Sequence, residues 1–261
     1  MERVTGGGTL PALLLASVGF LVLCRILGRL RAGAALQDAV VVITGATSGL
    51  GKECAHVFHS AGARLVLCGR DAGRLQQVVK ELNASARGGK PQRYVPSTVT
   101  FDLADTHSID RAAEDILKCY GRVDVLINNA GISYRGNILD THISVQRDVM
   151  ETNYFGPIAL TQALLPSMVR QRSGHIVVIS SVQGKIAIPY RSAFVDTTTA
   201  TGRDPRDVAH AVLKAVRHKS KDVVLAGPMP MVAIYLRTLW PALFFKITSS
   251  RARKEHKQKN T

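Results

Sequence analysis

Short apolar runs alternate with amphipathic segments from residue 39 to residue 181 of this 261-residue chain. The amphipathic segments carry apolar residues at helical spacing, as Leu50, Cys54, Val57 and Phe58 do. The runs have strand length and are rich in Val, Ile and Leu: Ala39–Ile43, Arg64–Cys68, Thr98–Phe101, Val123–Ile127 and His175–Ile179. Apolar strands joined by helices predict an α/β fold with a doubly wound parallel sheet covered by helices on both faces.

Prolines and helix caps mark three further elements. The helical pattern of Ile143–Arg170 contains Pro157 and Pro166, so we expect a bend or a break inside this long helix. Asp204–Pro205 has the composition of a helix start and predicts another helix after it. Asp222–Ala226 is a candidate sixth strand, which could pair beside the fifth strand.

The amino-terminal segment is apolar and ends in a basic cluster. Leu10–Cys24 contains a single polar residue, and Arg25, Arg29 and Arg31 follow it. Residues 1–31 therefore predict a single-pass membrane anchor with a basic flank, and the arginines favour a cytosolic position for the rest of the chain. An apolar hairpin lying in the interface is the alternative, and it also places the protein on a lipid bilayer.

Residues 228–261 combine an apolar segment with a basic tail. Met231–Ile247 is largely apolar, and it either lies on the bilayer or covers a substrate pocket. The tail, residues 251–259, suits anionic headgroups better than nucleic acid because no aromatic stacking platform lies near it. Lys257–Thr261 matches the K-x-K-x-x form of a dilysine retrieval signal, which predicts the endoplasmic reticulum membrane; a solvated tail is the alternative.

Composition narrows the possible binding partners and the chemistry of the cysteines. The chain has 34 Lys and Arg against 19 Asp and Glu, a formal charge of +15 that is concentrated toward the two ends. This distribution indicates an anionic membrane rather than a nucleic acid as the partner. The four cysteines are far apart in the sequence, so we expect reduced thiols and no metal site.

A glycine-rich turn links the first strand to the helix after it. Thr44–Gly51 has the sequence T-G-A-T-S-G-L-G. Glycines at these positions let the backbone turn tightly and approach a pyrophosphate, whose charge is met by free N–H groups and the helix dipole. The turn predicts a Rossmann-type dinucleotide site, although a turn needed only for packing is the alternative. The expected cofactor residues of this turn are Gly45, Thr47, Ser48, Gly49, Leu50 and Gly51.

The ends of the second and third strands bear on the choice of cofactor. Arg70 follows the second strand, where a basic residue would accept a 2′-phosphate and an acidic one would bind the ribose of NAD. Arg70 therefore favours NADP over NAD, although Asp71 comes next and Arg70 could be a solvated loop residue. Asp102, with Leu103, ends the third strand and is expected at the adenine edge.

Several motifs together resemble the short-chain dehydrogenase/reductase family. They are the glycine turn, Asn128–Gly131 after the fourth strand, Asn153 in the long helix and Ile179–Ser181 at the end of the fifth strand. The resemblance implies that Asn129, Ala130 and Gly131 line the cofactor. It also implies that Asn153 holds a proton-relay water and that Ser181 hydrogen-bonds a substrate carbonyl. Taken singly, these side chains could instead cap strand ends.

The chain departs from the family pattern after Ala193. Phe194 and Thr198 stand where the family has the proton-donating tyrosine and the lysine that lowers its pKa. A phenylalanine has no proton to give, and a helix and a strand of the family are also missing here. We therefore expect residues 38–227 to form an NADP-binding Rossmann domain that is incomplete after residue 193. Because the missing helix is one that the family uses for dimerisation, a homodimer is uncertain.

Two functions remain open. The resemblance implies an NADP(H)-dependent oxidoreductase that acts on a hydrophobic carbonyl or hydroxyl compound such as a lipid ketone, a retinoid or a steroid. The alternative, favoured for this chain because the tyrosine and lysine are missing, is a catalytically inactive form that binds the cofactor weakly or serves as an interaction module.

Overall fold

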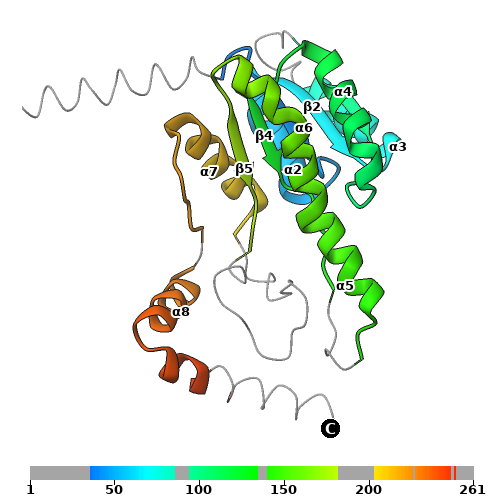
Figure 1. Cartoon of the computed structure of the whole chain (residues 1–261). Coiled ribbons are helices and arrows are strands. Elements are labelled where there is room, and N and C mark those ends of the chain that lie inside the picture. The colour runs from blue at the N-terminus through cyan, green and yellow to red at the C-terminus, as the bar shows by residue number, and fades with distance from the viewer. Residues whose placement is uncertain are drawn as a thin grey trace, which may run out of the picture.

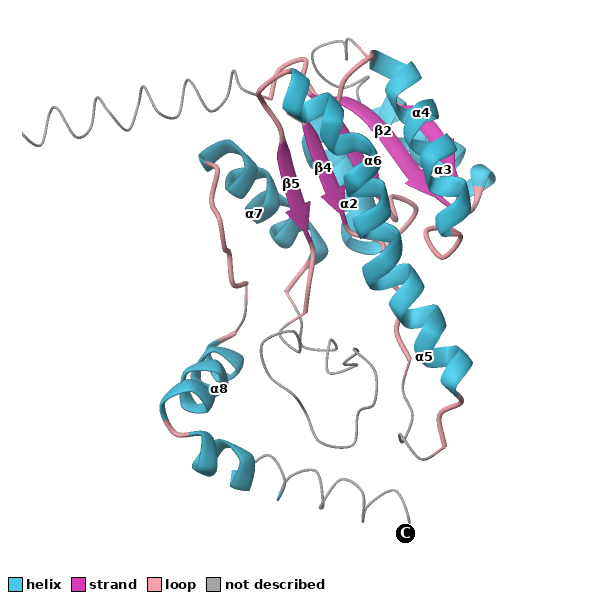
Figure 2. Ribbon diagram, in the orientation of Figure 1, coloured by secondary structure: helices cyan, strands magenta, loops and turns pink. Residues whose placement is uncertain are grey.

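Five parallel strands form one sheet in the order β3-β2-β1-β4-β5 (Figures 1 and 2). The computed structural model describes residues 36–85, 94–134, 140–181, 203–225, 227–247 and 250. The strands are β1 (Val40–Thr44), β2 (Arg64–Gly69), β3 (Ser97–Thr100), β4 (Val125–Asn128) and β5 (His175–Val178). The predicted parallel α/β sheet and its five strands are confirmed. The predicted anchor and the segment with Phe194 and Thr198 lie outside the described residues.

Helices cover both faces of the sheet because alternate strand residues point to opposite sides. On one face, Val41 and Ile43 pack with α2 (Gly49–Ser60), α3 (Ala72–Ser85) and α7 (Pro205–His218). On the other face, Val40 and Val42 pack with α4 (Ile109–Tyr120), which follows the short helix η2 (Thr106–Ser108), and with α6 (Gly156–Arg170). β1 is buried along its whole length, as expected for a central strand of a doubly wound sheet.

The long helix contains the predicted interruption at a proline. α5 (Ile143–Met150) continues into η3 (Glu151–Phe155), a π-helical segment, and then into α6. Pro157 is the second residue of α6 and lacks the N–H that would bond the carbonyl of Asn153, so the α-helical ladder is broken at this point. Pro166 sits inside α6 without ending it.

The carboxyl-terminal part differs in one respect from the prediction. α7 begins at Pro205 as expected, and the Asp204 side chain accepts a hydrogen bond from the N–H of Arg206. Residues 222–225 form no strand, so the expected pairing beside β5 is wrong for this described segment. The physical reason is that β-propensity alone does not hold a strand without a pairing partner, and the side chains of Val223 and Val224 stay exposed.

An apolar helical region follows. α8 (Pro228–Leu239) and a helical run at 241–247 occupy the predicted Met231–Ile247 segment. Among the described residues, no helix is both long enough and apolar enough to cross a membrane.

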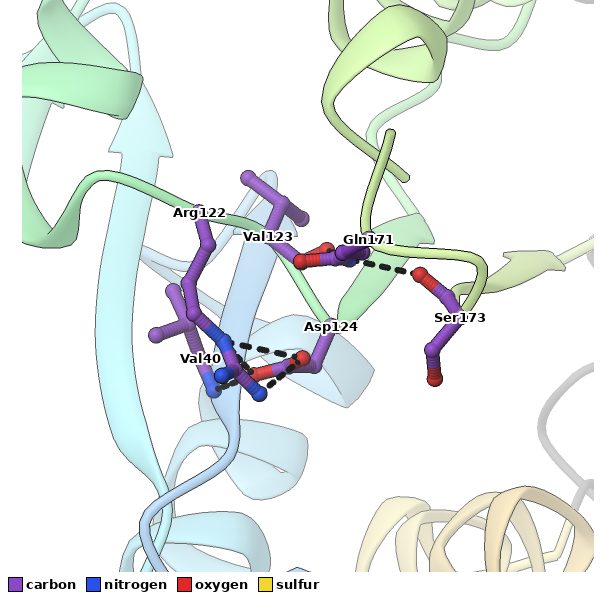
Figure 3. A network of polar contacts seen from close by, with 6 residues as sticks. All are labelled: Val40, Arg122, Val123, Asp124, Gln171 and Ser173. Atoms are coloured by element: carbon purple, nitrogen blue, oxygen red, sulfur yellow. Dashed lines mark hydrogen bonds and ion pairs between the residues drawn. The ribbon is translucent and has the colours of Figure 1, made fainter. Parts of the chain in front are cut away.

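A polar network ties the strands together at their amino ends (Figure 3). The Asp124 carboxylate accepts a hydrogen bond from the N–H of Val40 at 2.8 Å and pairs with Arg122. The Gln171 side chain donates to the carbonyls of Val123 and Ser173, both at 2.6 Å. These bonds fix the turn between α6 and β5 against the start of β4.

Candidate functional site

Ten of the predicted cofactor residues line one cavity of about 400 Å³. They lie at the carboxyl ends of β1, β2, β3 and β4, where parallel sheets place their ligand sites. β1 lies at the centre of the sheet, between β2 and β4, so the glycine turn after it reaches both halves of the cavity. The predicted residues that the structure brings together here are Gly45, Thr47, Ser48, Leu50, Arg70, Asp102, Leu103, Asn129, Ala130 and Gly131.

The glycines of the turn are required by backbone geometry and close packing. Gly45 and Gly49 have φ of +65° and +52°, in the left-handed region that favours glycine. A Cβ on Gly45 would lie 2.9 Å from the Cα of Ala130, and one on Gly51 would collide with the carbonyl oxygen of Gly45. Gly51 does not line the cavity but lets α2 start close beneath the turn. Any side chain at Gly45 or Gly51 would therefore push the turn out of place.

The first turn of α2 is built to meet a negative charge. Ser48 is the N-cap residue, yet its side chain makes no capping hydrogen bond, and the first turn has no acidic residue. The N–H groups at a helix start have no partner within the helix, and the helix dipole adds about half a positive charge there. Since Ser48 and Leu50 line the cavity, this helix start suits a phosphate group.

Thr44 holds the two sides of the cavity together, a role that the sequence did not reveal. Its hydroxyl accepts hydrogen bonds from the N–H groups of Asn129 and Ala130, both at 3.0 Å, and donates to the carbonyl of Ile127 at 3.4 Å. The Asn129 side chain donates in turn to the carbonyls of Thr44 and Gly45, at 3.0 and 3.4 Å. The fingerprint contained this threonine, but only the fold brings it against residues more than 80 positions away.

The charged side chains after β2 and β3 divide into two groups. The Asp71 carboxylate accepts from the N–H of Arg74 at 3.0 Å and so caps the start of α3. Arg70 is largely exposed, and its Nη1 lies 3.8 Å from Oδ2 of Asp102. Arg74, which the sequence analysis did not single out, also lines the cavity. Its Nε lies 3.5 Å from Oδ2 of Asp71. Two guanidinium groups therefore border the cavity, and Asp71 is engaged both with the start of the helix and with Arg74.

Asn153 is placed by η3 against the end of the fourth-strand motif. Its Oδ1 accepts from the N–H of Ile132 and its Nδ2 donates to the carbonyl of Ile132, both at 2.8 Å. A Cβ on Gly131 would lie 3.2 Å from the same Oδ1. Asn153 thus holds the backbone that follows Gly131, and its expected part in a proton relay stays a prediction.

Ser181 belongs to a different cavity. It lines a space of about 510 Å³ between β5, α7 and residues 220–225, and so do Ile179 and Ser180. Leu50 lines both this space and the cofactor cavity, which places the two cavities side by side. The structure does not bring Ser181 into the cofactor cavity, and its expected bond to a substrate carbonyl stays a prediction.

The thiols near the site are buried and unreactive in character. Burial raises the pKa of the Cys68 thiol, which borders the cofactor cavity, far above its usual range. Burial also raises the pKa of the Cys54 thiol to about 12. Both cysteines and Cys119 are free thiols, and Cys24 lies outside the described residues. Thiolate chemistry at this site is therefore not favoured.

The chain belongs to the short-chain dehydrogenase/reductase family. The family profile described as short chain dehydrogenase matches residues 39–200. Members of this family bind a nicotinamide cofactor, and the cavity at the glycine turn has the residues for one.

Curated relatives match the chain almost from end to end. "Dehydrogenase/reductase SDR family member 7B" of Danio rerio is 55% identical over 306 residues, covering 98% of both chains. The Bos taurus protein of the same name is 50% identical, covering all of this chain and 95% of its own. "Dehydrogenase/reductase SDR family member 7C" of Homo sapiens is 36% identical, covering 92% of this chain and 93% of its own length. The first alignment has 306 positions and the chain 261 residues, so at least 45 positions have no counterpart here.

Solved structures show the same fold. A metagenomic short-chain oxidoreductase in complex with NADP is 29% identical, with a TM-score of 0.60, over 70% of this chain and 91% of its own. LigD from Sphingobium sp. strain SYK-6, in its apo form, is 24% identical with a TM-score of 0.67. The match covers 76% of this chain and 94% of LigD.

Proposed function

We propose that this chain binds NADP(H) in a reductase site that lacks its proton donor. One observation carries the proposal: ten of the twelve residues expected for the cofactor converge on a single cavity, whereas Ser181 lies in another and Phe194 stands where the family has its tyrosine. The cavity fits a dinucleotide because it combines an uncapped helix start with glycines that leave room for a close approach. When bound, a nicotinamide nucleotide would supply the hydride chemistry of the family.

The charges around the cavity support NADP over NAD. A carboxylate that bound the ribose of NAD would have to be free, and Asp71 is occupied in capping α3. Arg70 is held only by a loose ion pair and has a side chain 68% exposed, so it can turn toward a 2′-phosphate. Arg74 adds a second guanidinium at the same border, where it also pairs with Asp71. Asp102 and Leu103 then remain for the adenine edge, and Asn129–Gly131 for the other end of the cofactor.

Two observations support the absence of a complete catalytic site: the residues at positions 194 and 198, and the length of the chain relative to its relatives. A free tyrosine has a pKa of about 10 and needs a nearby cation to donate a proton near neutral pH, and Phe194 and Thr198 provide neither group. We infer that the 45 or more positions without a counterpart correspond to a helix and a strand after Ala193. The half-exposed residues of β5 and the cavity beside it agree with a strand missing from that edge.

The membrane part of the proposal rests on the sequence. Leu10–Cys24 with its basic flank would anchor the chain in the endoplasmic reticulum membrane, with the domain facing the cytosol. A hydrophobic ligand such as a lipid ketone, a retinoid or a steroid would reach the cavity from that membrane. Asn83, in the sequon Asn83-Ala84-Ser85 of α3, tests the orientation. A glycosidase-sensitive change in mass at Asn83 would show a luminal domain and contradict this orientation.

The test of cofactor binding is a titration of the purified full chain with NADPH and NADH. We expect NADPH to bind at least about tenfold more tightly. The double variant R70A/R74A should weaken NADPH binding toward the level of NADH and leave NADH binding unchanged. R111A/R147A, which removes two exposed arginines of α4 and α5 outside the cavity, is the matched control. A folded chain with no measurable NADPH binding would contradict the proposal.

A second measurement addresses the chemistry. Carbonyl-dependent oxidation of NADPH should stay at the background rate with hydrophobic ketones and aldehydes. The names of the relatives favour the other candidate, an active oxidoreductase. Turnover well above background, lost in a variant that no longer binds NADPH, would establish that function and refute the inactive one.

A further inference from the structure

A cavity of about 820 Å³ lies at the amino ends of the strands, at the opposite end of the sheet from the glycine turn. Its wall is formed by residues 36–40, the turn after α6, the start of β5 and the end of α7. The cofactor proposal uses none of these residues. A ligand here would therefore leave the cofactor cavity free.

Three cations border this cavity without an acidic partner among the described residues: Arg172, Arg217 and Lys219. Two other basic residues of the wall are engaged, since Arg122 pairs with Asp124 and the Arg64 guanidinium lies 4.3 Å from the centre of the Tyr94 ring. The Nε of Arg217 is buried and has no hydrogen-bond partner. An unsatisfied buried guanidinium N–H is costly, and an anionic oxygen would satisfy it.

The backbone around these cations is strained. Asp38, Arg172 and Lys219 have φ of 63°, 51° and 51°, and they are the non-glycine residues with positive φ in the described part of the chain. All three line this cavity. Arg172 and Lys219 follow α6 and α7, where a left-handed residue is common, but glycine or asparagine is the usual choice. The network of Gln171 and Ser173 in Figure 3 holds the first of these turns in place.

Helix dipoles do not cancel the positive charge. The carboxyl ends of α6 and α7 lie at this end of the sheet, and each contributes about half a negative charge. Together they offset about one of the three cations, and the Asp38 carboxylate in the same wall offsets another. Arg64 adds a positive charge because its partner Tyr94 is neutral, so the wall as a whole stays positive. Burial and, to a smaller extent, the charge of Lys219 lower the pKa of His175, so this histidine is neutral near pH 7 and adds no charge of its own.

The opposite wall of the cavity is apolar. Leu165 and Val169 of α6 and Ile176 of β5 line it, and these residues are 41%, 64% and 38% exposed respectively. A small inorganic anion would satisfy the cations and leave this apolar wall in water. A ligand with an anionic head and a hydrocarbon chain would cover both surfaces.

We propose that this cavity binds an anionic lipid, with its phosphate at Arg172, Arg217 and Lys219 and its acyl carbons along Leu165, Val169 and Ile176. Residues 36–40 of the wall follow the basic flank of the sequence-predicted anchor after only a few residues. At most about 3.5 Å per residue, this connection keeps the cavity near the bilayer that the anchor would enter. The proposal is independent of cofactor binding.

The test is calorimetric titration of the detergent-purified full chain with short-chain dihexanoyl phosphatidic acid, dihexanoyl phosphatidylcholine and inorganic phosphate. Phosphatidic acid should bind at least about tenfold more tightly than either of the other two. The double variant R172N/K219N keeps residues that tolerate a left-handed backbone and should weaken phosphatidic acid binding about tenfold. R206Q/K214Q removes the same charge from exposed positions of α7 outside the cavity and should bind as the unmodified chain does.

Three results would overturn the proposal. Equal affinity for the two lipids would show that the cations do not select the head. Equal affinity for phosphatidic acid and inorganic phosphate would show that the apolar wall does not contribute to binding. Equal losses in both double variants would assign binding to overall charge. Unfolding midpoints of the variants within a few degrees of the unmodified chain exclude misfolding. If R172N/K219N fails this check, R217Q, which removes another cation of the cavity, takes its place.

Discussion

The Thr44 hydroxyl offers a direct test of how the cofactor cavity is held together. Replacing Thr44 by valine keeps the shape of the side chain and removes the acceptor for the N–H groups of Asn129 and Ala130. Thr44 is 1% exposed, so water cannot easily replace the hydroxyl. A buried donor left unsatisfied costs about 1–3 kcal/mol, and both donors here are only partly buried, so T44V should lower the free energy of unfolding by about 2–4 kcal/mol.

The matched control is T44S, which keeps the hydroxyl and loses one methyl group, at a cost of about 0.8 kcal/mol. Urea titrations of the full chain, followed by far-ultraviolet circular dichroism, measure both variants on the same scale. The order should be unmodified chain, T44S, T44V, with most of the loss between the last two. If T44V and T44S lose the same amount, the two hydrogen bonds to the hydroxyl do not stabilise the cavity, and the role assigned to Thr44 is wrong.

Two further predictions concern the turn and the response to acid. G51A should destabilise the chain by about 1–3 kcal/mol and weaken NADPH binding because its Cβ would collide with the Gly45 carbonyl, whereas G73A in α3 should be neutral or stabilising. Equal thermal shifts in both variants would count against this reasoning. Burial lowers the pKa of His59 below its usual 6.5, so the unfolded chain takes up a proton more readily and stability should fall as the pH drops through about 6.5. The loss of melting temperature between about pH 7.5 and 5.5 should be smaller in H59Q, and an identical loss in both chains would contradict the assignment.

The residues that line the cofactor cavity could be predicted from the sequence because they come directly after predicted strands. Arg70, Asp102 and Asn129 each follow a strand, and parallel strands bring their carboxyl ends to one edge of the sheet. The positions could therefore be placed without knowing any contact between them.

Other features required the folded chain. The bonds of Thr44 join residues 83 to 86 positions apart, and no local pattern encodes a pairing at that distance. Arg74 was missed because it lies inside a helix and reaches the cavity only through the position of α3. The Asp222–Ala226 strand was wrong over its described residues since apolar composition predicts a strand without fixing its pairing, and residues 222–225 do not pair with the open edge of β5.

The π-helical segment η3 also fixes how many residues the long helix can contain. It holds about one more residue per turn than the α-helix on either side, and Asn153 bonds Ile132 from this wider turn. Removing a single residue from 151–155 would let this turn close as a regular α-helix and would leave α5 in nearly the same orientation relative to α6, because the wider turn absorbs the extra residue. Removing a residue from the α-helical part of α6 would instead rotate everything before it by about 100°. A change of length in α6 would thus change which side chains of α5 face the protein, whereas the π-helical turn can lose one residue without that rotation.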